Sequence, residues 1–225
     1  MSFADKKLSE IAISVPGSTA LLREYDLDFC CGGADTLGAA AAEKNLNLAE
    51  IEARLTELQN SKKQDDELRW LTAPYADMIN HIIHRYHERH KQQLSELFVL
   101  AERVESVHGD RDDCPIGVAA EIQNIYADLS SHMMKEEQIL FPMIKMGNYA
   151  MARMPIQVME HEHAEHGDHL EVLKSLTNNL TPPADACNTW RALYSGIQEF
   201  MDDLMMHIHT ENNILFPRVI EEGSR

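Results

Sequence analysis

The chain has 225 residues, a formal net charge of -17 with histidine counted as neutral, and only 10 glycines. So acidic a surface repels phosphate backbones, which argues against nucleic acid as a direct partner. The low glycine and aromatic content favours helices over a turn-rich β fold. The first residues lack the apolar core of a signal peptide, and no apolar run approaches the roughly 18 residues of a membrane span. We therefore expect an all-α, cytoplasmic protein without a membrane partner.

Residues 1–58 are predicted to form a small helical domain of their own, and the polar residues 59–70 a linker. Apolar spacing predicts helices over residues 8–13 and 48–58. Ser18 is the expected N-cap of a helix that ends near residue 25, and Asp35 or Thr36 the expected N-cap of an alanine-rich helix.

Between these helices, residues 26–33 form a predicted loop with Cys30 and Cys31 at its tip. Without an export signal, the four cysteines of the chain are expected to be reduced thiols.

Residues 71–225 are predicted to form four long amphipathic helices. Their expected bounds are residues 73–108, 115–146, 155–179 and 184–219. Because the connections are short, consecutive helices should be antiparallel neighbours in an up-down-up-down bundle. The apolar stripe of the second helix is expected to run through Glu136 to Ile139.

One pattern occurs twice in this bundle. His132 precedes Glu136 by four residues, His207 precedes Glu211 by four, and a Phe-Pro pair follows each glutamate by five. Four residues of helix turn through about 400°, so each imidazole and carboxylate lie one turn apart on the same helix face. The first and third helices also match each other, with His87 and His90 in one and His163 and His166 in the other.

One histidine from each of the first and third helices, together with both pairs, gives four imidazoles and two carboxylates. This is too many donors for a tetrahedral zinc site. It suits two octahedral metals, each with two histidines and both glutamates as bridges, and such nitrogen and oxygen donors fit iron or manganese. Positions left open on a redox metal would bind O2, peroxide or NO. The pattern also differs from the Glu-x-x-His signature of ferritin-like proteins.

These residues resemble a hemerythrin-like di-iron domain. With residues 25–33 and 131–142, the whole chain resembles the RIC (repair of iron centres) family of the YtfE/ScdA type. The resemblance chooses His87 over His90 and His163 over His166. It implies two non-haem irons with oxo and carboxylate bridges, bound by His87, His132, Glu136, His163, His207 and Glu211.

The family resemblance implies repair of iron-sulfur clusters after nitrosative or oxidative damage, with damaged iron-sulfur proteins as partners. Three functions are open: iron donation, reduction of NO to N2O, and binding of O2 or NO by a sensor or carrier. Whether the chain is an enzyme is therefore left open, and a second copy of the chain is a candidate partner. The two adjacent thiols argue against a passive carrier.

Other polar residues have less specific predictions. Cys30 and Cys31 are candidates for handling iron, sulfur, NO or electrons. Asp128, one turn before His132, and Glu162, beside His163, could orient a ligand or relay protons, or be solvated carboxylates. Six histidines are expected to be exposed: His81, His84, His108, His161, His169 and His209.

Overall fold

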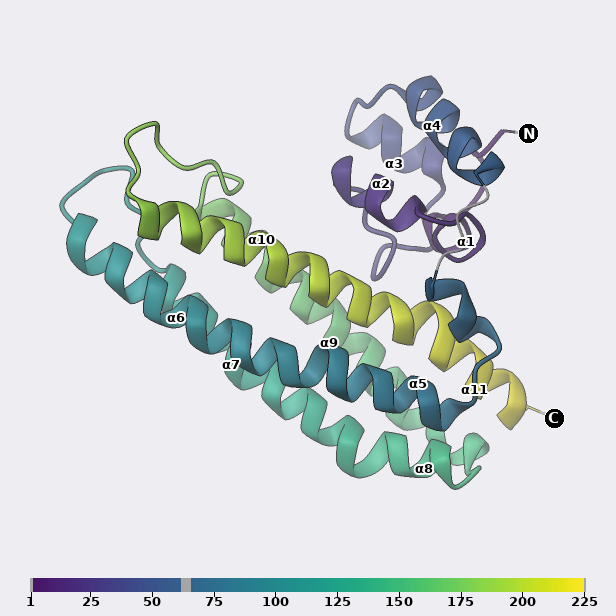
Figure 1. Ribbon diagram of the computed structural model, residues 1–225. Helices are drawn as coiled ribbons and strands as arrows, with labels where there is room; N and C mark the ends of the chain where they lie inside the picture. The colour runs from purple at the N-terminus through teal and green to yellow at the C-terminus, as the bar shows by residue number, and fades with distance from the viewer. Residues whose placement is uncertain (1, 62–65, 225) are drawn as a thin grey trace.

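The computed structural model describes residues 2–61 and 66–224 of the chain. A compact N-terminal region, residues 2–61, lies beside one half of a long four-helix bundle (Figure 1). The predicted all-α fold, a bundle preceded by a small helical part, is confirmed. The predicted division into residues 1–58, 59–70 and 71–225 stays a prediction, because residues 62–65 of the expected linker lie outside the described residues.

The N-terminal region contains four short helices, and a 3-10 segment leads into the bundle. Their bounds are α1 Leu8–Ser14, α2 Ser18–Glu24, α3 Leu37–Glu43, α4 Leu48–Asn60 and η1 Asp66–Leu71. The expected cap of α3 is present, because the Thr36 side chain accepts a hydrogen bond from the backbone N–H of Ala39 (3.3 Å). The expected cap at Ser18 is wrong. Gly17, at φ 78°, precedes α2, while the buried Ser18 hydroxyl donates to the carbonyl of Ile11 (3.0 Å).

Each long helix of the bundle except the third contains one wider π turn. The bounds are α5 Tyr75–Ile82, η2 Ile83–His87, α6 Glu88–His108, α7 Val118–Lys135, η3 Glu136–Leu140, α8 Phe141–Lys145, α9 Tyr149–Leu176, α10 Asn188–His209, η4 Thr210–Leu215 and α11 Phe216–Gly223. Helix α6 packs against α7 and α10, and α9 packs against α7 and α11, which gives the expected up-down-up-down order.

Two predicted helix starts are corrected. Helix α9 begins at Tyr149 and contains Pro155, which was expected to begin it. Pro155 cannot donate to the carbonyl four residues earlier, but Ala152 and Ile156 on either side are fully buried, and this packing carries the helix through the proline. Helix α10 begins at Asn188 rather than directly after Pro183.

The π turns change which residues face the core. The predicted stripe continues from Glu136 to Ile139, yet Ile139 is 48% exposed and Leu140 is buried. The π turn η3 supplies one more residue per turn than an α-helix, so the buried face moves by one position. Such turns are frequent at functional sites. Here η2 ends at His87, η3 begins at Glu136, and η4 contains Glu211.

A loop of the N-terminal region, residues 26–33 (the Cys loop), contacts η4 and α9 of the bundle. The Asn213 amide donates to the Phe29 carbonyl (2.8 Å), and the Asn212 amide donates to the Cys30 carbonyl (3.1 Å). The Cys31 thiol donates to the backbone carbonyl of His163 (3.3 Å). These contacts couple the two parts of the chain next to the predicted metal ligands.

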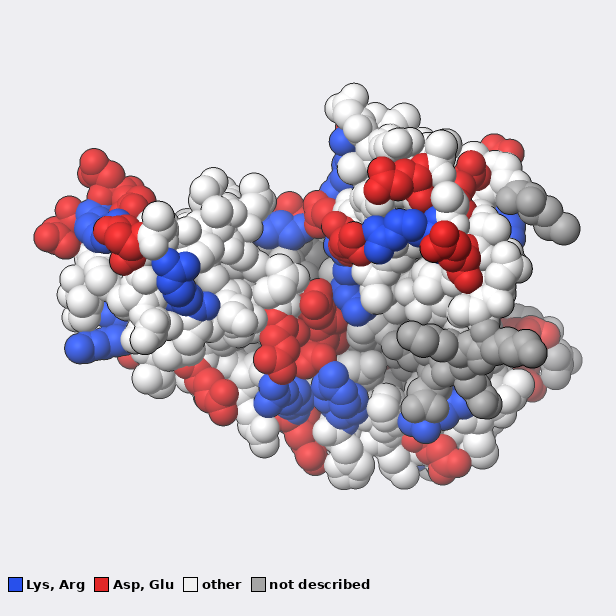
Figure 2. Space-filling model, turned by 45° about the horizontal axis from the view of Figure 1, so that its top comes forward, with Lys and Arg blue, Asp and Glu red and all other residues white. Residues whose placement is uncertain are grey.

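Charge also contributes to this contact. On the face shown in Figure 2, acidic side chains gather at the bundle end that lies far from the N-terminal region. At the contact itself, Lys174 of α9 and Lys44 donate to the Asp26 carboxylate (2.7 and 2.5 Å). Burial opposes ionisation of Asp26, but the two lysines together lower its pKa below the ordinary 3.8. This attraction is present at neutral pH and is lost as the pH falls below 3.8 through the lowered value.

Asp26→Asn is therefore expected to weaken the contact between the Cys loop and α9. At neutral pH, amide hydrogen exchange over residues 26–33 should become severalfold faster, while exchange in α6 and α7 stays unchanged. High salt should reproduce part of the effect in the unmodified chain, because partly exposed pairs are screened. Asp35→Asn, at an exposed position of the same region, is the matched control.

None of the helices among the described residues has the length and apolar character needed to cross a bilayer.

Candidate metal centre

The structure brings all six predicted ligands together in the middle of the bundle, and all six are buried. They form two overlapping groups, in each of which the candidate ligand atoms lie within 4.8 Å of one another. We call His87 and His207 the first half-site, and His132 and His163 the second half-site. Both half-sites include the carboxylates of Glu136 and Glu211.

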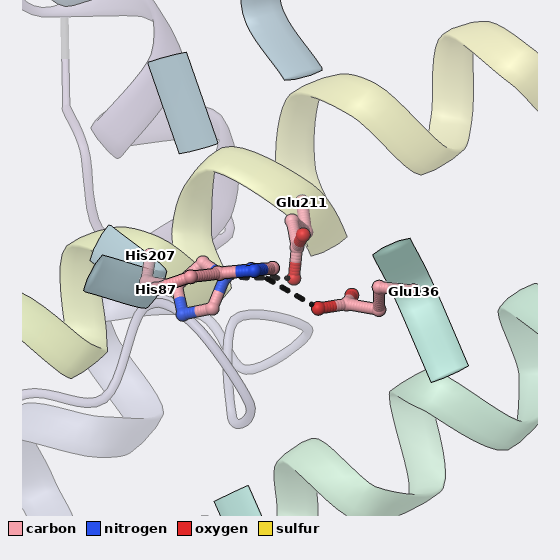
Figure 3. A group of neighbouring side chains, drawn as sticks. All are labelled: His87, Glu136, His207 and Glu211. Carbon is pink, nitrogen blue, oxygen red and sulfur yellow. Dashed lines mark hydrogen bonds and ion pairs between the residues drawn. The ribbon is translucent and has the colours of Figure 1, made fainter. Parts of the chain in front are cut away.

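The two carboxylates lie between the half-sites. Oε2 of Glu136 is 3.3 Å from Nε2 of His87 and 3.4 Å from Nε2 of His132. Oε2 of Glu211 is 3.5 Å from Nε2 of His207 and 3.2 Å from Nε2 of His163. Figure 3 shows the two carboxylates pointing toward each other beside the imidazoles of the first half-site. Each glutamate thus contacts one histidine of each half-site, as a bridging ligand must.

Pairs of imidazole nitrogens also converge. Nε2 of His87 lies 3.2 Å from Nε2 of His207, and Nε2 of His132 lies 3.1 Å from Nε2 of His163. All four histidines therefore direct the same ring nitrogen to the centre.

The donors fit a cation. All four carboxylate oxygens of Glu136 and Glu211 are buried and have no hydrogen-bond partner. Burial and the adjacent Glu211 carboxylate raise the pKa of Glu136 well above its usual value. Burial opposes ionisation of Glu211 as well, but His207 and His163 lower its pKa. A buried carboxylate without a partner is costly, and metal ions would remove this cost at both residues. Imidazole nitrogen with carboxylate oxygen and no thiolate suits iron.

Three of the four histidines are held by an acceptor at their other ring nitrogen, Nδ1. His87 donates to Glu137 (2.9 Å), His132 donates to Glu162 (3.0 Å), and His163 donates to Asn212 (2.7 Å). Such acceptors fix the ring orientation and raise the basicity of a ligand. Sequence reasoning missed Glu137 and Asn212. The sequence does contain a pattern that could have identified them, because each residue directly follows the glutamate of a His-x-x-x-Glu pair.

The histidines of the first half-site have fewer hydrogen bonds at Nδ1 than those of the second. Nδ1 of His207 is buried and has no hydrogen-bond partner, and the Tyr86 ring stacks on this imidazole (centroids 5.2 Å apart). Burial also lowers the pKa of His207. The repeated sequence thus produces two half-sites that differ in their outer contacts.

Of the two carboxylates predicted to orient a ligand, Glu162 contacts one and Asp128 does not. Glu162 accepts from His132 on the neighbouring helix rather than from the adjacent His163, and Lys135 also contacts it. Mainly through the His132 contact, its pKa falls to about 2 despite partial burial, so it is ionised at neutral pH. Asp128 contacts His169 (3.2 Å) and none of the six ligands.

Other histidine predictions are partly corrected. Of the six histidines expected to be exposed, His84 and His161 are exposed, while His81, His108 and His169 are half-buried. His209, expected to be exposed, is buried. The Phe29 ring of the Cys loop packs edge-on against its imidazole, with centroids 5.2 Å apart. The Phe29 ring belongs to a part of the chain that is distant in sequence, so helical periodicity alone could not predict that His209 is buried. His90 and His166, the alternatives to the predicted ligands, are buried beside the centre but are absent from both ligand groups.

The two adjacent thiols lie beside the second half-site. Asp28 accepts hydrogen bonds from the backbone N–H groups of Cys30 and Cys31 (2.9 and 3.0 Å), and the two Sγ atoms are 3.8 Å apart. The contact with Cys31, burial and the Asp28 carboxylate raise the pKa of Cys30 well above its usual value. Cys30 is therefore a thiol at neutral pH. Asn212 links this loop to the centre, because it donates to Cys30 and accepts from His163.

Glu162→Gln is expected to weaken iron binding at the second half-site by about 10- to 100-fold, because His132 loses its carboxylate acceptor. Competition with a graded ferrous chelator measures this affinity. Glu171→Gln, an exposed carboxylate on the same helix that contacts Lys174, is the control and should bind as the unmodified chain does. Equal affinity of Glu162→Gln and the control would exclude this role for Glu162.

Known proteins share both parts of the chain. Residues 78–219 match the family described as hemerythrin HHE cation binding domain, and residues 4–59 match a domain of unknown function, ScdA_N (DUF542). A "probable iron-sulfur cluster repair protein" of Haemophilus influenzae is 69% identical over 222 residues, which cover 99% of this chain and all of the relative. This chain belongs to the YtfE-type family of iron-sulfur cluster repair proteins. The "iron-sulfur cluster repair protein YtfE" of Musicola paradisiaca is 57% identical, with 98% of each chain covered. That of Escherichia coli O81 is 53% identical over 98% of this chain and 99% of its own.

Family membership confirms the predicted resemblance and the hemerythrin-like bundle. The clustered histidines and glutamates suggest that the YtfE-type chain binds two irons.

Proposed function

We propose that this protein holds two non-haem irons in the bundle and supplies iron to damaged iron-sulfur clusters of other proteins. The observation that carries the proposal is the pair of buried carboxylates, each between a histidine of one half-site and a histidine of the other. The names of the relatives support iron-sulfur proteins as the targets.

In this proposal His87 and His207 bind one iron, and His132 and His163 bind the other. Glu136 and Glu211 bridge the two irons, together with an oxo group. Bound iron supplies redox chemistry and an exchangeable ion. The protein supplies the orientation of the ligands. Glu137, Glu162 and Asn212 hold three of the imidazoles by their Nδ1 atoms, so each half-site is ready to receive its ion.

The supply function requires that iron can leave. Two features favour release over a permanently closed site. The His207 imidazole has no acceptor at Nδ1, and a ligand without this support binds metal less tightly. The Cys loop touches the second half-site through Asn212 and the carbonyl of His163, so a change in the loop reaches the ligands directly.

Small ligands also belong to the proposal. With four protein donors for each iron, positions remain for NO, O2 or peroxide. The adjacent Cys30 and Cys31 lie beside the centre, with the Cys31 thiol on the His163 carbonyl, and we propose that they exchange electrons or NO with it. We place the protein in the cytoplasm, where its cysteines, all free among the described residues, stay reduced.

Reduced, iron-loaded protein given NO without any cluster protein separates repair from NO reduction. A parallel reaction contains an apo-form iron-sulfur protein and sulfide but no NO. We expect iron to move to the acceptor, whose cluster absorption returns, and less than one N2O per di-iron centre to form with NO. Multiple turnovers of N2O without iron transfer would instead make the chain an NO reductase. Reversible NO binding without either result would make it a carrier or sensor.

A further inference from the structure

A pocket of about 320 Å³ lies between the Cys loop, α9 and α10, and none of the six predicted iron ligands lines it. Four sulfur-bearing side chains do: Cys30 and Cys31 of the loop, and Met201 and Met205 of α10. The two methionines are four residues apart and therefore lie on the same face of α10. A Cβ added to Gly167 of α9 would lie 4.0 Å from Sγ of Cys31. The glycine thus leaves the space beside this thiol open.

The two thiols are spaced as two ligands of one metal ion would be. Their Sγ atoms lie 3.8 Å apart. With metal–sulfur bonds of about 2.3 Å and angles of about 109 to 120°, two thiolates on one ion lie roughly 3.8 to 4.0 Å apart. An ion can therefore bind between Cys30 and Cys31 without a rearrangement of the loop.

The backbone of the Cys loop is held in place by Asp28. Its carboxylate accepts hydrogen bonds from the backbone N–H groups of Cys30 (2.9 Å), Cys31 (3.0 Å) and Gly32 (2.8 Å). These bonds orient both cysteines before an ion arrives. The carboxylate also lies within 4.8 Å of both thiols. Because it already accepts three backbone hydrogen bonds, it is a weaker donor to an ion than the two sulfur atoms.

The pocket is acidic, which favours a cation over an anion as its ligand. Lys44 and Lys174 face four carboxylates: Asp26, Asp28, Asp168 and Glu171. Both lysines donate to Asp26 (2.5 and 2.7 Å), and Lys174 also donates to Glu171 (2.7 Å). No histidine within the described part of the chain lines the pocket. The donors that remain beside the thiols are thioethers, and thiolates with thioethers select soft ions such as Cu(I).

We propose that this pocket is a Cu(I) site, formed by the thiolates of Cys30 and Cys31 and the thioether of Met205. Met205 is half-buried, and it lies closer along the chain than Met201 to Asn212, whose amide donates to the Cys30 carbonyl. Cu(I) binds without a change in its oxidation state, and the two thiol protons pass to solvent. The site shares no ligand with the di-iron centre, so it goes beyond the supply of iron.

A bound ion changes a contact of the second half-site. The Cys31 thiol donates to the backbone carbonyl of His163 (3.3 Å). Cu(I) takes the place of the donated proton, so this hydrogen bond is lost when the site fills. Binding of a soft metal by the Cys loop is thereby coupled to the helix that carries an iron ligand.

Anaerobic competition for Cu(I) tests the site. Full-length, iron-loaded protein is used, so that the histidines of the bundle are occupied, and Cu(I) is supplied as its complex with bathocuproine disulfonate, a coloured chelator. We expect each chain to withdraw one Cu(I) and to keep its iron, and X-ray absorption of the bound copper to show sulfur neighbours only. Nitrogen or oxygen neighbours would overturn the site. Because iron and copper are measured separately, a chain that holds no iron would contradict the proposed function and not this site.

Two variants identify the ligands. Cys30→Ser with Cys31→Ser is expected to lose the copper. Met205→Leu, which keeps the side-chain volume, should bind it on the order of tenfold more weakly, which corresponds to about 1.4 kcal/mol. This second variant keeps the test decisive if the loss of both cysteines disturbs the loop.

The matched controls are Cys114→Ser with Cys187→Ser, and Met154→Leu at an exposed methionine of α9. Both should bind Cu(I) as tightly as the unmodified chain does. Unchanged affinity in the Cys30 and Cys31 double variant, or in Met205→Leu, would overturn the site.

Discussion

Replacing Glu136 and Glu211 together by leucine is expected to abolish iron binding and to leave the helical fold in place. The two carboxylates are the only ligands shared by both half-sites among the described residues, so their loss removes donors from both irons at once. After reconstitution, the iron content measured by metal analysis should fall from about two irons per chain to none. The far-ultraviolet circular dichroism should stay unchanged. Iron bound at the unmodified level would contradict the bridging role.

The same substitutions should stabilise the iron-free chain. Both carboxylates are fully buried and lack hydrogen-bond partners. A buried carboxyl group without a hydrogen bond costs free energy to bury, so an apolar side chain of similar size in its place should raise the free energy of unfolding of the iron-free chain. Denaturant unfolding of the iron-free proteins measures the change. Glu96→Leu with Glu102→Leu, at exposed positions of α6, is the matched control and should bind two irons.

Cys30→Ser with Cys31→Ser is expected to separate iron binding from function. The Cys31 thiol contacts the His163 carbonyl, and the Asn212 amide donates to the backbone carbonyl of Cys30, which serine keeps. Neither thiol belongs to the six predicted ligands, so both irons should remain. Iron transfer to an apo-form acceptor should fall on the order of tenfold, which corresponds to about 1.4 kcal/mol in the activation barrier.

Cys114→Ser with Cys187→Ser, which changes two cysteines of the connections between bundle helices, is the control and should transfer iron at the normal rate. Full activity of the Cys30 and Cys31 double variant would remove these thiols from the proposed function. Loss of iron from that variant would show instead that the Cys loop stabilises the centre rather than taking part in transfer.

Much of this architecture can be predicted from the sequence because it depends on patterns within single helices. Apolar periodicity predicts the bundle, and the repeated four-residue spacing places His132 with Glu136 and His207 with Glu211. Spacing alone cannot separate His87 from His90, because both lie in the buried stripe and both are buried in the structure. The family resemblance makes that choice, and the structure places His87 rather than His90 within reach of Glu136.

The predictions that the structure corrects were wrong for two physical reasons. The π turn at Glu136 shifts the buried face by one residue, which exposes Ile139 and buries Leu140. Long-range contacts account for the others. His209 is buried because Phe29 covers it, and Glu162 supports a histidine of another helix rather than its neighbour in sequence. Such contacts depend on the packing of distant segments, which no local pattern contains.

We propose a di-iron centre built from four histidines and two bridging glutamates, and metal analysis of the purified chain is its most direct test. The full-length protein, produced in iron-supplemented medium, is analysed for iron, manganese and zinc, and its near-ultraviolet and visible spectrum is recorded. We expect about two irons per chain and an oxo-to-iron absorption in the near-ultraviolet. One zinc per chain without iron would contradict it.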